Sequence, residues 1–226
     1  MKAIVQDTYG SADRLHLRDI DPQVPRDDEV LVRVHAAGVD PSVWHLMTGR
    51  PYVARLNRRI GLRRPAHRVR GWDAAGVLET VGARVTSLKP GDEVFGQCNG
   101  SFAEYACGRA EQLAPKPTGL TFEQAAAFPA SAVTALQALD LARPRPGRQV
   151  LVIGASGGVG TCAVQLAVRC GARVTGVCGP AGAGLVAARV RAWRRAAGGT
   201  SRPKAGGGNL TTGPRTGRCG PRRPGR

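Results

Sequence analysis

The sequence predicts an α/β protein with a barrel-like β domain, the beginning of a doubly wound parallel sheet, and a disordered basic tail. Three observations support this prediction. Residues 1–120 contain short strand-like segments separated by glycine and proline. Residues 149–178 follow the order strand, glycine-rich turn, helix and strand. Residues 179–226 consist mainly of Gly, Ala, Pro and Arg, which cannot bury enough apolar surface to offset the entropy of ordering.

Six segments of the first part have the length and composition of strands. In one of them, Val30–His35, three valines alternate with Leu31, Arg33 and His35, so one face should be more buried than the other. The six segments are Lys2–Gln6, Leu15–Arg18, Val30–His35, Ala75–Val81, Glu93–Phe95 and Phe102–Ala106. Together they predict a compact β domain over residues 1–120.

Helices are expected between this domain and the second sheet. Thr121–Gln124 has the pattern of a capping box, which opens a helix. Pro129 interrupts that helix, and Ser131 can restart it. The apolar stripe expected to dock on the sheet is Ala132, Leu136 and Leu139. Residues 121–178 are therefore assigned to connecting helices and one βαβ unit.

The βαβ unit begins with Val150–Ile153, four residues typical of a buried parallel strand. A glycine-dense turn and a helix ending at Gly171 follow, and Arg173–Cys178 supplies the second strand. Because the helix N-terminus points unpaired amides at the turn, this arrangement is a site for a dinucleotide pyrophosphate.

The turn has the glycine pattern of dinucleotide-binding loops, with alanine in the first glycine place. Gly157 would let the backbone approach phosphate, and Gly160 would let the helix pack on the strand. Because strand, helix and second strand have the required spacing, dinucleotide binding is favoured over a merely tight structural turn. The residues expected to bind the cofactor here are Gly154, Ala155, Ser156, Gly157, Gly158, Val159 and Gly160.

The formal charge of +17 on 226 residues is unevenly distributed. Residues 179–226 hold ten Arg and one Lys with no Asp or Glu, so most of the excess charge lies there. The rest of the chain is only mildly basic, which argues against a nucleic-acid footprint over the body of the protein. Within the tail, Leu185–Trp193 is the one stretch that could form a transient basic helix.

A cytoplasmic location is expected by default. The chain starts with a strand-like pattern rather than a basic segment followed by a long apolar one, and no apolar run approaches membrane-spanning length. The six cysteines include no CxxC pair, so a structural zinc lobe is not predicted.

Eight ordered motifs in residues 1–178 resemble those of the medium-chain dehydrogenases/reductases, most closely the zinc-independent quinone oxidoreductase (zeta-crystallin-like) and enoyl-reductase branch. The motifs are Gly38–Ser42, Gly71–Val77, Val81–Gly82, Lys89–Gly96, Phe102–Tyr105, Glu123–Ala127, Thr134–Leu139 and Gly154–Gly160. The resemblance implies a GroES-like catalytic domain, a Rossmann domain that is incomplete in this chain, an active site between them, and NADPH as hydride donor. An intact relative could form a homodimer, and no membrane partner is expected.

The same resemblance permits a test for catalytic zinc. Alcohol dehydrogenases of this superfamily have cysteine and histidine ligands where this chain has Asp40, Trp72 and Asp73, and the third-ligand region near Ala130 and Ser131 has neither residue. Without thiolate or imidazole ligands no metal is expected, and hydrogen-bond donors must polarise the substrate carbonyl.

Three residues are candidate catalytic groups by position. Asp40 replaces an asparagine that in quinone reductases lies near nicotinamide and substrate; equally, it could be a turn residue before Pro41. His45 and Tyr52 match cleft positions and could donate a proton or orient substrate, although packed or surface roles are at least as well supported.

The resemblance also bears on the cofactor. Thr134 corresponds to a threonine that approaches the nicotinamide, with a hydrogen bond to a helix carbonyl as the alternative. Cys178, at the end of the second strand, lies where an acid would select NAD; the chain has no acid beyond Asp140, which favours NADP(H) over NAD(H). The basic run Arg55–Arg64, with His67, Arg68 and Arg70, borders the cleft in relatives; a solvated loop is favoured over attraction of an anionic substrate.

From about residue 179 the match to the family ends. We interpret this part as an out-of-frame or misassembled continuation of a GC-rich coding sequence. Three functions remain open: an NADP(H)-dependent, zinc-independent reductase of a quinone, enone or related carbonyl; a catalytically inactive, truncated remnant of such an enzyme; and a binder of nucleic acid or an anionic surface through the Arg-rich tail.

Overall fold

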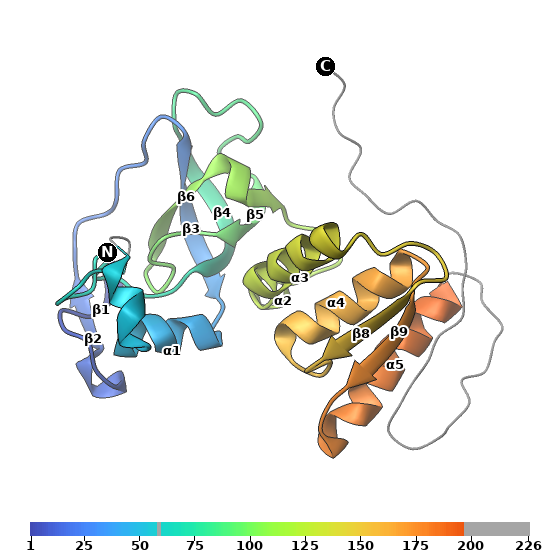
Figure 1. Ribbon diagram of the computed structural model, residues 1–226. Coiled ribbons are helices and arrows are strands. Elements are labelled where there is room, and N and C mark those ends of the chain that lie inside the picture. The colour runs from blue at the N-terminus through green and yellow to red at the C-terminus, as the bar shows by residue number, and fades with distance from the viewer. Residues whose placement is uncertain (58–59, 197–226) are drawn as a thin grey trace. The chain divides into compact units, whose positions relative to one another are not determined.

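The computed structural model describes residues 1–57 and 60–196 (Figure 1). The chain divides into two compact units, Met1–Ala130 and the part from Ser131 onward. Arg58 and Arg59 of the basic run lie outside the described residues, as do residues 197–226 of the predicted tail.

The first unit is built on a five-stranded antiparallel sheet with the strand order β6-β3-β4-β5-β7. Its strands are β3 (Glu29–Ala37), β4 (Asp73–Val81), β5 (Glu93–Gln97), β6 (Tyr105–Arg109) and β7 (Leu113–Pro115). A second antiparallel pair consists of β1 (Lys2–Val5) and β2 (His16–Asp19). The predicted β domain is therefore present.

The main core of this unit lies between the strands and the loop that follows β4. Val30, Val32, Leu78 and Val94 are almost fully buried there. The predicted alternation in β3 is found at the valines and at Arg33 and His35, which are exposed. Leu31 is an exception, because it is also buried; the ladder shifts register between Leu31 and Val32 where β3 pairs with β4.

Helical segments close the remaining sides of the first unit. They are η1 (Ala12–Arg14), α1 (Pro41–Thr48), η2 (Tyr52–Leu56), η3 (Ala110–Gln112) and α2 (Phe122–Ala126). The capping box that opens α2 is confirmed: the Gln124 amide donates to the Thr121 hydroxyl, and the Thr121 amide donates to the Gln124 side chain.

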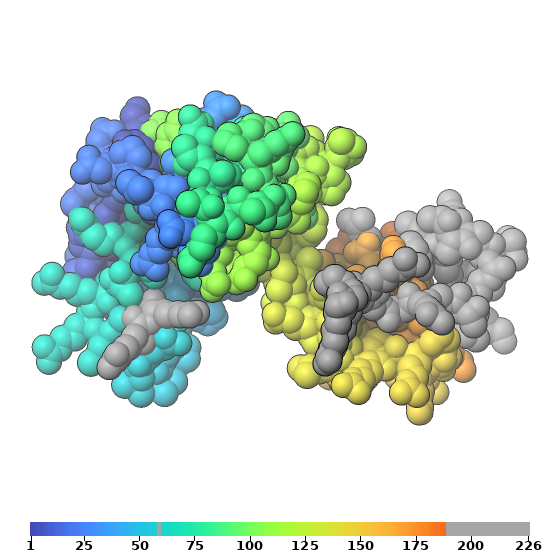
Figure 2. All heavy atoms as spheres, turned by 90° about the horizontal axis from the view of Figure 1, so that it is seen from above, coloured from blue at the N-terminus to red at the C-terminus, as the bar shows by residue number. Residues whose placement is uncertain are grey.

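In Figure 2 the segment around residues 60–70, coloured cyan to teal, projects side chains from the surface of this unit.

Helix α3 (Pro129–Ala142) starts two residues earlier than the sequence suggested. The predicted restart at Ser131 is corrected because Pro129 occupies the first helical position, where its missing N–H costs nothing. Of the predicted apolar stripe, Leu139 is buried and Leu136 is exposed.

The second unit contains β8 (Gln149–Ile153) and β9 (Arg173–Val177), which pair in parallel and are joined by α4 (Gly158–Arg169). The predicted βαβ unit is present. Val152 and Val174 pack with α4 in the core, whereas Leu151 is 61% and Ile153 is 78% exposed. The expectation of a strand buried throughout is thus wrong at alternate residues, because only one set of β8 side chains meets the helices.

Helix α5 (Pro180–Ala196) contains the stretch Leu185–Trp193 that was expected to form a helix, and it corrects the prediction of disorder for the other residues between 180 and 196. Val186 is 3% exposed and joins Val164 of α4 in the core. Tertiary packing of this kind stabilises helices whose composition alone would not. Within the part of the chain that the structure describes, no helix is both long and apolar enough to span a bilayer.

Leu78 should dominate the stability of the first unit. It is 2% exposed, whereas Leu17 in β2 is 66% exposed. We expect Leu78→Ala to lower the free energy of unfolding by about 2–5 kcal/mol, because it leaves a cavity, and Leu17→Ala to lower it by less than about 0.5 kcal/mol. Urea unfolding followed by circular dichroism measures both values; equal losses would contradict the assigned core.

Candidate functional site

The turn after β8 is fixed by hydrogen bonds to the end of β9. The amides of Gly154 and Ala155 both donate to the Val177 carbonyl oxygen, at 2.9 and 3.0 Å, and the Gly157 amide donates to the Gly154 carbonyl at 3.0 Å. Gly154 has φ 78°, in the left-handed region that favours glycine. The predicted glycine-rich turn therefore holds a defined conformation.

Helix α4 begins directly on this turn. A Cβ atom on Gly160 would lie 2.1 Å from the Gly154 carbonyl oxygen, so only glycine permits this contact. Gly157 is the N-cap and, being glycine, has no side chain with which to cap the helix. The amides of Gly158, Val159 and Gly160 have no acceptor within the helix, so they are donors for an anion.

Two further helix starts meet the same turn. A Cβ on Gly158 would lie 2.6 Å from the Ser131 hydroxyl, in the first turns of α3. A Cβ on Gly182, in the first turn of α5, would lie 2.6 Å from the Ser156 hydroxyl. From the sequence, Ser131 was expected only to start a helix and to lie in a region without zinc ligands. Its hydroxyl was not predicted to lie beside the loop. A hydroxyl in the first turn after Pro129 was the signal that could have found it.

The other two predicted cofactor residues lie in this second unit. Thr134 lies on an exposed part of α3. Cys178 directly follows β9, is half-buried and packs against the core of the unit. Gly179 and Pro180 come next, so the end of β9 carries no acid.

Asp40, in the first unit, is the N-cap of α1. One carboxylate oxygen accepts a hydrogen bond of 2.6 Å from the Ser42 amide. The other, Oδ2, is buried and makes no hydrogen bond with any described residue. Asp40 therefore has the turn role before Pro41 that the sequence left open. Its Oδ2 can still accept a hydrogen bond.

Asp73 is a neighbouring acid at the start of β4. It is 3% exposed, its Oδ2 accepts a hydrogen bond of 2.9 Å from the Ala130 amide, and its Oδ1 has no hydrogen-bond partner among the described residues. Burial raises the pKa of Asp73 to about 6; the hydrogen bond from Ala130 opposes the rise, and the charge of Asp40 adds to it. The two acids are thus electrostatically coupled.

His45 and Tyr52 lie apart from the N-cap of α1. His45 is near the C-terminal end of the helix, and its Nδ1 is 3.0 Å from the Arg50 carbonyl oxygen, to which it donates. Tyr52 is 64% exposed, with the guanidinium carbons of Arg55 and Arg50 at 4.8 and 5.8 Å from its ring centre. His45 and Tyr52 both contact Arg50. Asp40, the third predicted catalytic residue, interacts with Asp73.

The positions that hold zinc ligands in alcohol dehydrogenases do converge. The charge of Asp40 raises the pKa of Asp73, and Oδ2 of Asp73 accepts a hydrogen bond from the Ala130 amide. The side chains at these positions are two carboxylates and the indole of Trp72. Across the described ranges, no group of three His, Cys, Asp or Glu side chains could hold a metal ion. None of Asp40, Trp72 and Asp73 offers the thiolate or imidazole that zinc prefers.

The chain resembles known proteins in both sequence and fold. The alcohol dehydrogenase GroES-like domain matches residues 26–118. Quinone oxidoreductase from Mus musculus is 38% identical over 184 residues, covering 79% of this chain and 53% of that protein. The quinone oxidoreductase structure from Coxiella burnetii has a TM-score of 0.73 and 31% identity, covering 84% of this chain and 60% of its own.

The chain belongs to the medium-chain dehydrogenase/reductase superfamily. Quinone oxidoreductases are among the relatives that it matches. A further structure of this superfamily fold, from a mycobacterial protein complexed with NADPH, has a TM-score of 0.69 and 28% identity and covers 84% of this chain and 55% of its own. The chain spans about half the length of the curated relatives it matches.

The coupling of the two acids predicts how stability depends on pH. The pKa of Asp73 is about 6 in the folded protein and 3.8 without its surroundings, so the folded state holds the proton more tightly. The free energy of unfolding should therefore fall as the pH rises from 4 to 7. Asp73→Asn keeps an acceptor for the Ala130 amide but has no carboxyl group to titrate. Its free energy of unfolding should fall less over this pH range, by on the order of 1–3 kcal/mol.

Denaturant unfolding between pH 4 and 7.5 tests this expectation. Asp40→Asn is the matched variant: it removes the like charge but not the burial, so it should reduce the fall only in part. Parallel stability curves for the wild-type protein and Asp73→Asn would show that Asp73 does not titrate in this range.

Proposed function

We propose that the chain is the cofactor-loop and catalytic-domain portion of a zinc-independent, NADP(H)-dependent oxidoreductase that reduces a quinone, an enone or a related carbonyl. The observation that supports it most is the first turn of α4. Three backbone amides lie at the start of this helix, where Gly160 leaves no room for a side chain, next to the Ser131 hydroxyl. The relatives named quinone oxidoreductase support the substrate class.

The loop residues would hold the dinucleotide by its pyrophosphate. The amides at the start of α4 and the positive end of the helix dipole favour a doubly charged phosphate group. Ser131 and Ser156 offer hydroxyls from either side, and Gly157 lets the backbone approach. The nicotinamide would supply the hydride; the protein supplies position and charge.

The choice of NADP(H) rests on the end of β9. An acid there would bind the ribose hydroxyls of NAD, and its charge would repel the 2′-phosphate of NADP. Cys178, Gly179 and Pro180 carry no charge, and the NADPH complex of a structural neighbour is consistent with this choice. The preference belongs to the proposal.

The catalytic residues divide into two roles in this proposal. Asp40 and Asp73 would be positioning residues, because each carboxylate accepts a hydrogen bond from a backbone amide, that of Ser42 and that of Ala130. His45 and Tyr52 are exposed side chains with transferable protons, so either could protonate the reduced substrate. The zinc-free assignment follows from a donor set without thiolate or imidazole.

Cofactor binding tests the proposal directly. We expect the wild-type protein to bind NADPH in a fluorescence titration, and Gly157→Ala to weaken binding by about tenfold or more, because its methyl group occupies the phosphate approach. Gly157→Ala should fold, since its Cβ would meet only the Gly154 carbonyl oxygen at 3.4 Å. Gly184→Ala, in α5 with open space around it, is the matched control and should bind like the wild type.

Turnover is measured separately with NADPH and a panel of quinones and enones. Failure of a folded wild-type protein to bind NADPH would reject the proposed function. Unchanged binding by Gly157→Ala would reject the loop as the site. Binding without turnover would favour the alternative of an inactive remnant.

A further inference from the structure

Arg70, immediately before Gly71 in the first unit, is a buried cation without an acidic partner. Its side chain is 6% exposed, and no described carboxylate forms an ion pair with it. Burial lowers the pKa of Arg70, and the nearby Tyr9 has a smaller, opposite effect. Lone charges in protein interiors are strongly unfavourable, so buried arginines are normally paired.

Backbone carbonyls satisfy only part of the guanidinium. Nη1 donates to the Leu46 carbonyl oxygen at 3.5 Å, and Nη2 donates to the His67 carbonyl oxygen. Nε is buried and has no hydrogen-bond partner among the described residues. A guanidinium has five N–H donors in one plane, so donors remain for another acceptor.

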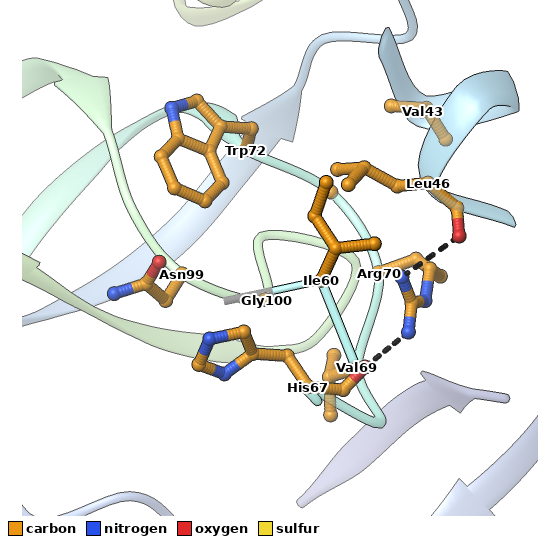
Figure 3. Close-up of a pocket in the computed structure, with 10 residues that line it drawn as sticks. Val43, Leu46, Ile60, His67, Val69, Arg70, Trp72, Asn99 and Gly100 are labelled. Atoms are coloured by element: carbon orange, nitrogen blue, oxygen red, sulfur yellow. Dashed lines mark hydrogen bonds between the residues drawn. The ribbon is translucent and has the colours of Figure 1, made fainter. Parts of the chain in front are cut away.

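A cavity of about 40 Å³ adjoins this group. Figure 3 shows Trp72, Asn99 and the ring of His67 on one side of it, and Arg70 with Leu46 on the other. The remaining walls are apolar and are formed by Val43, Ile60 and Val69, with Gly71 and Gly100. The cavity therefore combines one cation, an amide and an imidazole with aliphatic and aromatic walls.

The size of the cavity limits what it can hold. About 10–15 Å³ on this measure holds one water molecule, so about 40 Å³ corresponds to a few non-hydrogen atoms. A phosphate ester or a nucleotide is too large. A carboxylate group that carries one or two further carbons fits, and its two oxygens match the planar fork of a guanidinium.

We propose that the cavity beside Arg70 binds the carboxylate group of a small aliphatic organic acid, with Asn99 as a second donor and Trp72 and Leu46 against the carbon chain. All of these residues lie in the first unit, so the site does not depend on the dinucleotide loop. The bound anion supplies the negative charge that the buried arginine lacks.

The test is a titration of the full chain with sodium propionate carrying a ¹³C-labelled carboxylate, followed by NMR. Wild-type protein should give saturable binding, and propionamide, the neutral isostere, should not compete. Arg70→Met keeps an apolar side chain of similar length and should weaken binding by about tenfold or more. Arg68→Met is the matched control, because Arg68 is exposed and pairs with Asp7 at 2.7 Å; its binding should be unchanged.

Asn99→Ala leaves Arg70 in place and should weaken binding several-fold, so it decides the matter if Arg70→Met does not fold. No saturable binding by the wild type, binding of chloride as tight as that of propionate, or wild-type affinity in the Asn99→Ala and Arg70→Met proteins would each overturn the proposal. Because the titration contains no nicotinamide, its outcome is independent of NADPH binding.

Discussion

The contact between α4 and the turn after β8 is the constraint on which the second unit depends. Gly160 lies so close to the Gly154 carbonyl oxygen that no side chain fits between them. This contact brings the first turn of the helix onto the end of the strand, and the Val177 carbonyl then fixes the turn to β9. The first amides of α4, which have no acceptor within the helix, consequently lie at a loop that is fixed by hydrogen bonds. A dinucleotide site needs this pre-organisation, since ordering a flexible loop would cost affinity.

In the first unit an electrostatic constraint plays a comparable part. Asp73, at the start of β4, accepts a hydrogen bond from the Ala130 amide and lies close enough to Asp40 for the two charges to interact. Both carboxylates keep one oxygen without a partner among the described residues. At the positions that correspond to zinc ligands in alcohol dehydrogenases, this chain thus has two neighbouring carboxylates, and the pKa of one of them is raised.

The sequence predicted those features that depend on neighbouring residues. The capping box at Thr121, the βαβ unit and the glycine turn are local, because each is set by residue types at fixed spacing. Asp40 was correctly given a possible turn role before Pro41 for the same reason. Features that depend on packing between distant segments were missed or wrong.

Three residues illustrate the difference. Arg70 belongs to a run of arginines expected to be solvated, yet contacts with α1 and the His67 backbone bury it. Ile153 lies in an apolar segment that is typical of a buried strand, yet its side chain is exposed among the described residues. Val186 lies in a segment whose composition predicts disorder, and a single contact surface with α4 orders its helix. No local pattern distinguishes these cases.

The central claim is that the start of α4 is the phosphate-binding element. Backbone amide ¹⁵N–¹H NMR spectra recorded with and without NADPH test it most directly. The account predicts that the largest shifts occur at the amides of Gly158, Val159 and Gly160, because these donate to the pyrophosphate. NADPH binding that leaves these three amides unshifted while others move would contradict it.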